Sequence, residues 1–404
     1  MADVLLGVVA IIIAAYLFSQ IAKALKLPAV LGQLGAGFIL AAPFISDAIF
    51  PPEASQLFSF LAEIGILLMF FLAGLGLRLD KKGKDLNLMI SISVLNTMIP
   101  LVGGFLASYF IFSFGFVESL FIGAALAVSS QAISYRILDE AGMATHKIST
   151  FIVGSGIVDD IVEFIILTVL LTFFGVIVTD PADLAVGIVL FVAVIIFFRF
   201  YLIHFILERI SREPSQATYF MASMVIILLM AYFASLLGIS AFLAAIISGI
   251  IVRQILTSLP DLRNVGKSIS STVKTAANGF FVPIFFVWAG MNAATADFDV
   301  GALILIAVLI LIDICGTLLG TIIAMLQAGK KLDDAIIVAV GVVPKGDTEL
   351  ALALIALQAG IIDHEIYSSI IVMAFMVTII SSVLFRHLLN ERKKKLNHKA
   401  EQGS

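Results

Sequence analysis

The chain has 404 residues, of which 61% are hydrophobic and only 13% are charged. Soluble domains are about half apolar and about a quarter charged, so this composition excludes an ordinary soluble protein and indicates a polytopic membrane protein. The formal net charge of −4 says little, because the placement of charge matters more than its sum in a membrane protein.

The predicted elements are membrane-spanning helices, each of which needs about 20 predominantly apolar residues. The sequence contains 13 candidate segments and predicts an all-α fold. In chain order they are residues 3–22, 29–46, 56–77, 86–112, 116–137, 147–176, 182–207, 215–236, 239–257, 268–291, 300–328, 332–358 and 365–388. We therefore predict a single transmembrane transporter unit over residues 1–390 and a basic cytoplasmic tail over residues 391–404.

Basic residues follow every second segment of this series. All of the 24 Lys and Arg residues except Lys345 belong to that set of connections and segment ends. In the connections on the opposite side, the charged residues are all acidic. Because cytoplasmic connections are enriched in Lys and Arg, the pattern predicts an external N-terminus and a cytoplasmic C-terminus in the cell membrane.

The two halves of the chain resemble each other in short stretches. The three matching pairs are residues 31–40 with 243–252, 71–74 with 287–290, and 140–146 with 358–364. The members of each pair are separated by 212, 216 and 218 residues, respectively. This separation pairs the first six segments with the last six and leaves the seventh as a linker. An offset of seven helices reverses the direction of the second half, which predicts the inverted repeat of many secondary transporters.

The segment 147–176 contains three acidic residues in an otherwise apolar run: Asp159, Asp160 and Glu163. One ionised carboxylate at the centre of a membrane helix costs at least about 2.5–3.5 kcal/mol, so such residues usually belong to an ion or proton path. Ser155 and Glu163 lie one turn on either side of Asp159. We predict that Asp160 and Asp159 bind a metal cation and protons in competition, and that Ser155 and Glu163 belong to the same site.

Two other segments have polar interruptions at corresponding places in the two halves. Interrupted membrane helices expose carbonyl groups and helix ends that can bind an ion or offset a charge. In the fifth segment we predict that Ser129, Ser130 and Gln131 contribute to the ion site. In the twelfth we predict that five residues support the break: Pro344, Lys345, Gly346, Asp347 and Glu349.

These features together resemble the monovalent cation/proton antiporters, most closely the branch with the NapA-type sodium/proton antiporters and the membrane domain of the Kef-type potassium efflux systems. The resemblance covers nearly the whole chain and rests on the 13 segments, the repeat, the Asp159–Asp160 pair and the two interruptions. It implies the NhaA/NapA-like antiporter fold, in which two discontinuous helices cross and alternating access is elevator-like.

Further implications of the resemblance concern particular segments and residues. A mobile core domain would include the fifth, sixth, twelfth and thirteenth segments, and a dimerisation domain the first and eighth. Asp160 would bind Na⁺ and the proton, and Asp159 would assist or carry a second proton. The chain departs from the pattern in its eleventh segment, where NapA-like members usually carry a Lys after a Gly, because Thr317 follows Gly316 here and Asp313 lies one turn earlier.

The leading hypothesis is a secondary active sodium/proton antiporter that exchanges Na⁺, or Li⁺, for H⁺. A potassium/proton antiporter, and a transport-inactive membrane sensor or channel-like subunit, remain alternatives. The partners expected are a monovalent cation, the proton, the lipid bilayer and a second copy of the chain in a homodimer. We expect neither an enzyme nor a nucleic-acid-binding protein, and no cofactor apart from the transported Na⁺ and H⁺.

Overall fold

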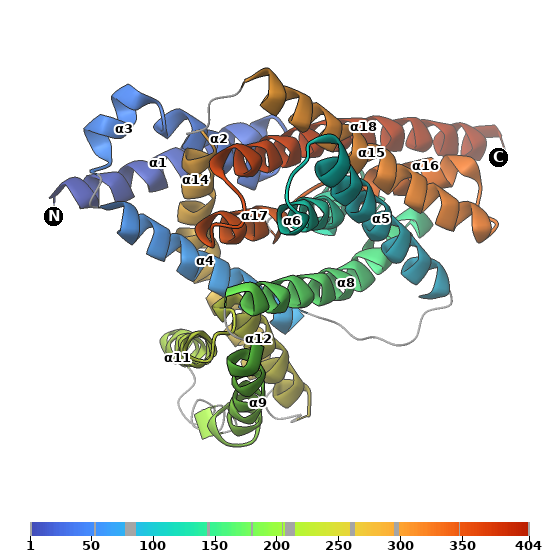
Figure 1. Ribbon diagram of the computed structural model, residues 1–404. Helices are drawn as coiled ribbons and strands as arrows, with labels where there is room; N and C mark the ends of the chain where they lie inside the picture. The colour runs from blue at the N-terminus through green and yellow to red at the C-terminus, as the bar shows by residue number, and fades with distance from the viewer. Residues whose placement is uncertain are drawn as a thin grey trace. The chain divides into compact units, whose positions relative to one another are not determined.

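The fold was analysed in a computed structural model of the chain (Figure 1). The structure describes residues 2–51, 54–76, 86–143, 146–178, 181–203, 205–206, 215–258, 263–294, 299–346 and 348–402. Within these ranges the regular elements are all helices, so the prediction of an all-α membrane protein is confirmed.

Each segment predicted from hydropathy coincides with one helix or with consecutive helices. The α-helices are α1 (Ala2–Ala24), α2 (Ala29–Leu40), α3 (Pro43–Ile49), α4 (Ser55–Gly76), α5 (Leu86–Leu106), α6 (Phe116–Ala127), α7 (Gln131–Glu140), α8 (Lys147–Val178), α9 (Pro181–Phe197), α11 (Gln216–Leu236), α12 (Ala241–Ser258), α13 (Arg263–Ala276), α14 (Val282–Ala293), α15 (Val300–Gln327), α16 (Leu332–Val342), α17 (Thr348–Gln358) and α18 (His364–Gln402). Single π-helical turns follow three of them, at Ala107–Ile111, Phe198–Leu202 and Ala277–Phe281.

Seven helices in the described part of the chain are long and apolar enough to cross a membrane, or eight if α2 and α3 form one bent span. Shorter apolar helices of 10–17 residues include α6 and α17, each of which is half of a broken segment. The chain is therefore a multi-pass membrane protein. The count of 13 spans and the inverted repeat stay predictions.

Two predicted segments differ from the helices observed. The segment 29–46 is two helices, α2 and α3, whose axes are bent by 88°. Pro43 begins α3, and a proline both lacks an N–H donor and disfavours helical geometry at the residue before it, so the helix ends near this point. The predicted segment 365–388 is shorter than the observed helix. α18 continues without interruption from His364 to Gln402 and includes most of the predicted tail.

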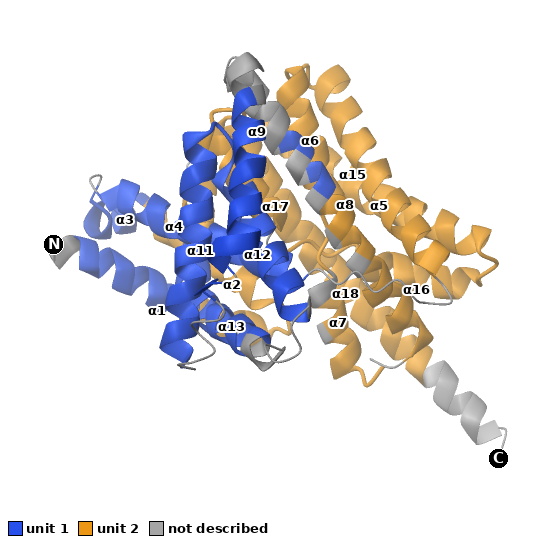
Figure 2. Ribbon diagram, turned by 90° about the horizontal axis from the view of Figure 1, so that it is seen from below, with its two compact units in different colours: residues 1–15, 43–79, 165–288 blue, residues 16–42, 80–164, 289–404 orange. Residues whose placement is uncertain are grey.

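The chain divides into two compact units (Figure 2). Unit 1 contains Met1–Ala15, Pro43–Leu79 and Ile165–Trp288, and unit 2 contains Tyr16–Ala42, Asp80–Phe164 and Ala289–Ser404. The segments predicted to form a mobile core lie mainly in unit 2, whereas the eighth segment, predicted for dimerisation, lies in unit 1. The roles of core and dimerisation domain stay predictions.

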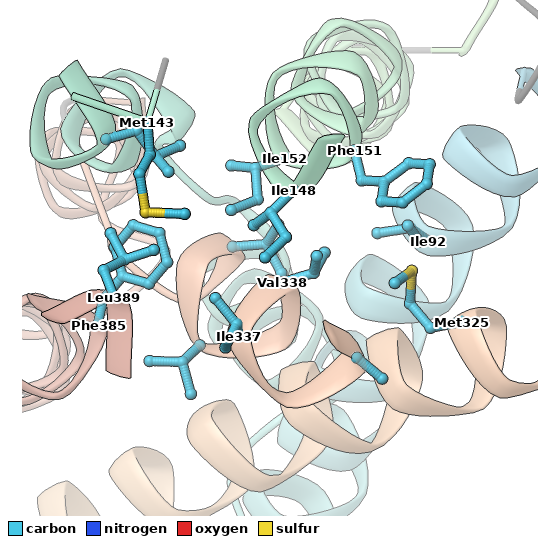
Figure 3. Packing of buried hydrophobic residues seen from close by; sticks show 14 of the residues in the cluster. Ile92, Met143, Ile148, Phe151, Ile152, Met325, Ile337, Val338, Phe385 and Leu389 are labelled. Carbon is cyan, nitrogen blue, oxygen red and sulfur yellow. The ribbon is translucent and has the colours of Figure 1, made fainter. Parts of the chain in front are cut away.

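Unit 2 holds its helices together through a buried hydrophobic cluster (Figure 3). Ile148, Phe151 and Ile152 of α8 pack there with Val338 of α16 and with residues of α5, α7, α15 and α18. Ile152 and Val338 are fully buried. Lipid tails are as apolar as these side chains, so the cluster stabilises the fold through close van der Waals packing. It holds the first turns of α8, which precede Asp159, against the helices around them.

Candidate functional site

The two helix interruptions lie in contact with each other in unit 2. The first is the three-residue link 128–130 between α6 and α7, and the second is the link that follows α16 and precedes α17. The backbone N–H of Ser130 donates to the carbonyl oxygen of Pro344 at 2.7 Å. Because α6 packs against α17 and α7 against α16, the two broken helices cross at their links.

Lys345 places a buried positive charge at this crossing. Its Nζ lies 2.6 Å from the carbonyl oxygens of Leu126 and Val128, at the C-terminal end of α6, and 2.8 Å from Oδ1 of Asp313 on α15. An ammonium group has three donors, so these three acceptors match its capacity. The side chain thus offsets the partial negative charge at the end of α6 and forms a buried ion pair with Asp313.

The backbone of the second link is held by α18. The Thr378 hydroxyl accepts a hydrogen bond from the Lys345 N–H at 3.0 Å and donates to the Lys345 carbonyl at 3.2 Å. Gly346 lies close to Ser130, and a Cβ atom at Gly346 would lie 2.5 Å from the Ser130 Oγ. A glycine is therefore required here for the two links to approach each other.

Acidic side chains lie at the N-terminal ends of α7 and α17, where the partial charge is opposite to that at the C-terminal end of α6. Oε1 of Glu163, on α8, accepts the backbone N–H of Ser129 at 2.7 Å, just before α7 begins. Glu349 is 1% exposed and belongs to the first turn of α17. Negative groups near a helix N-terminus are favourable because the unpaired N–H groups there carry partial positive charge. The crossing is thus built from helix ends matched by groups of opposite charge.

Asp159 lies beside this crossing on α8 and is 1% exposed. Its carboxylate accepts hydrogen bonds from Asn96 Nδ2 at 3.3 Å, Thr97 Oγ1 at 3.4 Å and Ser129 Oγ at 3.3 Å. These three donors are neutral groups and satisfy part of the hydrogen-bonding capacity of the buried carboxylate. The distances exceed the usual 2.7–3.2 Å range, so the contacts surround the carboxylate loosely.

The group around Asp159 is suited to a hard monovalent cation. Hard cations prefer oxygen ligands such as carboxylates, amide carbonyls and hydroxyls. Asp159, Asn96, Thr97 and Ser129 supply oxygens of all three kinds within one buried group. A buried carboxylate in this setting can bind either a cation or a proton, which is the chemistry that alternate binding of the two requires.

Other predicted site residues are placed differently or lie outside the description. The Ser155 hydroxyl donates to the Ile152 carbonyl of its own helix at 3.0 Å. Asp160 and Gln131 lie in α8 and α7, but their side chains are outside the described part, as is the whole of Asp347. The ion-binding roles predicted for Asp160, Gln131 and Ser155 stay predictions.

Sequence reasoning missed two residues of the site, Asn96 and Thr97 on α5. Both are buried; Asn96 donates to Asp159, and the Thr97 hydroxyl lies within reach of both Asn96 Oδ1 and Asp159. Two adjacent polar residues within an apolar segment, shortly before Pro100, are the signal that could have identified them. The pairing of Asp313 with Lys345 was not predicted either, because no sequence pattern connects the two residues.

These features define a class of protein: a multi-pass membrane protein with a buried carboxylate centre beside two crossed, interrupted helices. The family model described as "Sodium/hydrogen exchanger, transmembrane" matches residues 8–391. The chain therefore belongs to the sodium/hydrogen exchanger family, which is a family of antiporters, and the resemblance drawn from the sequence is confirmed at this level.

Named relatives cover almost the whole chain. The Na(+)/H(+)-K(+) antiporter GerN of Bacillus cereus is 26% identical over 389 residues, which are 96% of each chain. An Na(+)/H(+) antiporter of Enterococcus hirae is 27% identical over 382 residues, covering 93% of this chain and 96% of the relative. The structure of the sodium proton antiporter MjNhaP1 from Methanocaldococcus jannaschii matches with a TM-score of 0.65 at 16% identity, covering 94% of this chain and 96% of that chain, and supports the fold.

Proposed function

We propose that the protein is a sodium/proton antiporter that exchanges Na⁺, or Li⁺, for H⁺ at the Asp159–Asp160 pair. The observation that carries this proposal is the buried Asp159 carboxylate, surrounded by the oxygen-bearing side chains of Asn96, Thr97 and Ser129. Asp160 follows it in α8 and is the residue on which cation and proton would bind in alternation. The names of the Bacillus and Enterococcus relatives support the same activity.

We further propose that transport proceeds by elevator-like alternating access. The helices around the site, α5–α8 and α15–α18, would move together as the core. The contacts within unit 2 support this role, since the crossing, the Lys345–Asp313 ion pair and the hydrophobic cluster all tie these helices to one another. The inverted repeat and a homodimer belong to the same proposal.

Potassium is a second candidate substrate, because the printed name of the relative GerN includes K⁺. Carboxylate and hydroxyl oxygens bind either alkali cation, and the size of the site decides between them. Na⁺ and K⁺ therefore need to be compared in the same membrane vesicles.

The test is cation-driven proton movement in liposomes containing the purified protein. Solid-supported-membrane electrometry with steps of Na⁺ and then K⁺ detects net charge transfer, and a pH-sensitive dye detects exchange that moves no net charge. We expect Asp160→Asn to abolish exchange in a protein that still folds, whereas Asp139→Asn, at an exposed site on α7, serves as the matched control. Exchange that persists in Asp160→Asn overturns the assigned site, and no exchange of either cation by the wild type overturns the proposed function.

A further inference from the structure

Glu163 is a buried acid beside the candidate site, and the exchange proposed at the Asp159–Asp160 pair gives it no part. It is 7% exposed and lies one turn after Asp159 on α8. Residues four positions apart on a helix lie on the same face. Both carboxyl groups accordingly reach the first link, 128–130, and each of them contacts Ser129 there.

The two contacts involve different parts of Ser129. Glu163 Oε1 accepts the backbone N–H at 2.7 Å, whereas Asp159 Oδ2 accepts the side-chain hydroxyl at 3.3 Å. The first distance is within the usual range for a hydrogen bond, and the second is longer than that range. The backbone of Ser129 is therefore held more closely than its side chain, and the backbone position decides where the hydroxyl lies.

The second link holds the other backbone groups of the first link. The Val128 carbonyl accepts a hydrogen bond from Lys345 Nζ at 2.6 Å, and the Ser130 N–H donates to the Pro344 carbonyl at 2.7 Å. These contacts fix the two links against each other. Neither of them involves α8, so neither by itself sets the distance between the first link and the acidic residues of α8.

The contact with Glu163 connects the first link to α8. Ser129 lies between α6 and α7, outside regular secondary structure, so no helical hydrogen-bond ladder holds it. Glu163 and Asp159 belong to one continuous helix, which keeps the spacing of their backbones constant. An acceptor on Glu163 therefore sets the distance between Ser129 and Asp159.

The Ser129 hydroxyl can serve a cation as well as the carboxylate. A hydroxyl has one proton to donate and two lone pairs, and a hard cation prefers oxygen ligands. In the structure its proton is directed to Asp159. When a cation occupies the carboxylate, rotation of the hydroxyl proton turns a lone pair of the same oxygen to the ion. The affinity for the cation then depends on how well Ser129 is placed.

We propose that Glu163 is a positioning residue of the cation site, which holds the Ser129 N–H so that the Ser129 hydroxyl stays at Asp159. This inference rests on the proposed function, because it gives Glu163 a part in the exchange. Glu163 itself neither binds the transported cation nor carries its proton. Its acceptor oxygen supports the affinity for the cation in addition to the helix break.

The experiment measures the apparent KM for the cation and the maximal rate in liposomes, with the pH-sensitive dye and the cation that the wild type exchanges. Glu163→Gln keeps an acceptor oxygen and removes the charge. Glu163→Leu removes the acceptor, and Glu163→Asp keeps the charge but shortens the side chain by one methylene. Ser129→Ala removes the hydroxyl and keeps the N–H, and it is combined with Glu163→Leu in a double-mutant cycle.

We expect Glu163→Gln to keep the apparent KM close to that of the wild type. Glu163→Leu and Glu163→Asp should each raise it about two- to tenfold, which corresponds to the loss of one ordinary hydrogen bond. Ser129→Ala should raise it to a similar extent. Adding Glu163→Leu to Ser129→Ala should raise it no further, because Glu163 acts through the hydroxyl that is already absent.

Three results overturn the proposal. If Glu163→Gln raises the apparent KM as much as Glu163→Leu does, the charge is required and Glu163 acts directly on the cation or the proton. If the double variant shows the product of the two single effects, Glu163 does not act through Ser129. If Glu163→Leu lowers only the maximal rate, the residue supports the fold alone, since a loss of folded protein leaves the KM unchanged.

Ser134→Ala is the matched control. Ser134 is a fully buried serine on α7 whose hydroxyl has no hydrogen-bond partner in the described part of the chain, so its loss should leave the KM unchanged. If thermal unfolding shows that Glu163→Leu does not fold, Glu163→Asp takes its place in the cycle. Failure of the proposed function is distinguishable, because the wild type would then exchange neither Na⁺ nor K⁺.

Discussion

Nζ of Lys345 lies 2.8 Å from the Asp313 carboxylate, and both side chains are buried. The base comes from the link between α16 and α17, and the acid comes from α15, so the ion pair joins a third helix to the crossing of the two broken ones. The resemblance drawn from the sequence would place a Lys at the position of Thr317, one turn after Asp313. In this chain the base paired with Asp313 is on the neighbouring link, and in the described part of the chain Asp159 accepts hydrogen bonds from Asn96 and Ser129.

Removing Lys345 should destabilise the protein strongly. Lys345→Met leaves Asp313 as a buried charge and removes the donor to two carbonyls at the end of α6. Breaking one partner of a buried ion pair costs about 3–5 kcal/mol. Thermal unfolding of the purified protein in detergent checks this. The double variant Lys345→Met/Asp313→Leu should recover part of the loss, because it removes the uncompensated charge.

An exposed ion pair provides the control for this prediction. Arg386 on α18 lies 2.8 Å from Glu140 on α7, and both side chains are partly exposed. Glu140→Gln should cost no more than about 1 kcal/mol, because solvent screens pairs at the surface. Equal destabilisation by Glu140→Gln and Lys345→Met would contradict the special role of the buried pair.

Thr97→Val should weaken sodium-dependent exchange while the protein remains folded. The substitution keeps the shape of the side chain but removes the hydroxyl, whose single proton is shared between Asn96 Oδ1 at 3.1 Å and Asp159 Oδ1 at 3.4 Å. Because this contact is long, we take the roughly 0.5–1.5 kcal/mol of an ordinary hydrogen bond, so the apparent KM for Na⁺ should rise about two- to tenfold. The pH-dye assay in liposomes measures this change.

Thr321→Val is the matched control for Thr97→Val. Thr321 is a fully buried threonine on α15 whose hydroxyl has no hydrogen-bond partner in the described part of the chain. Its removal should leave the apparent KM for Na⁺ close to that of the wild type. A similar rise in both variants would show that buried threonines in general, and not the contact with Asp159, determine the effect.

Gly346→Ala should separate the two links and impair both stability and exchange. The added Cβ would lie 2.5 Å from the Ser130 Oγ, so the backbone of one link must shift. Overpacking of this kind costs about 1–3 kcal/mol. Thermal unfolding and liposome flux measure the two effects. Gly35→Ala is the control, because a Cβ at Gly35 meets no atom within 4 Å.

Glu163→Leu should destabilise the protein more than Glu163→Gln does. Leucine leaves the Ser129 N–H without the acceptor that lies 2.7 Å away, and an unsatisfied buried donor costs about 1–3 kcal/mol. Glutamine keeps an acceptor oxygen and loses only the charge. Equal thermal stability of the two variants would argue against a role for this hydrogen bond in holding the break.

The sequence predicted the helical segments and both interruptions well, because each is a local property of the chain. A span requires a long apolar run, and a proline and a glycine two residues apart, as at Pro344 and Gly346, favour an interruption within such a run. The bend at Pro43 was available to the same reasoning but was not predicted. The sequence also predicted the intramembrane position of Asp159, because the residue stands within a long apolar run.

The sequence did not predict the contacts between segments. Lys345 and Asp313, or Asn96 and Asp159, are far apart along the chain, and their pairing depends on how helices pack. Hydropathy gives no information about packing, because all the segments are similarly apolar. The site could therefore be located on α8 from the sequence, but its neutral donors on α5 could not.

The sequence by itself determined the class of protein and the apolar helical segments, and it singled out the carboxylates of the candidate site, because polar residues are costly in a bilayer and are therefore rare in such segments. Only the tertiary structure decided the direction of each polar side chain at the crossing. It directed the Ser129 hydroxyl to Asp159 and brought Ser130 against Gly346 of the other link, because these contacts depend on how the two broken helices cross.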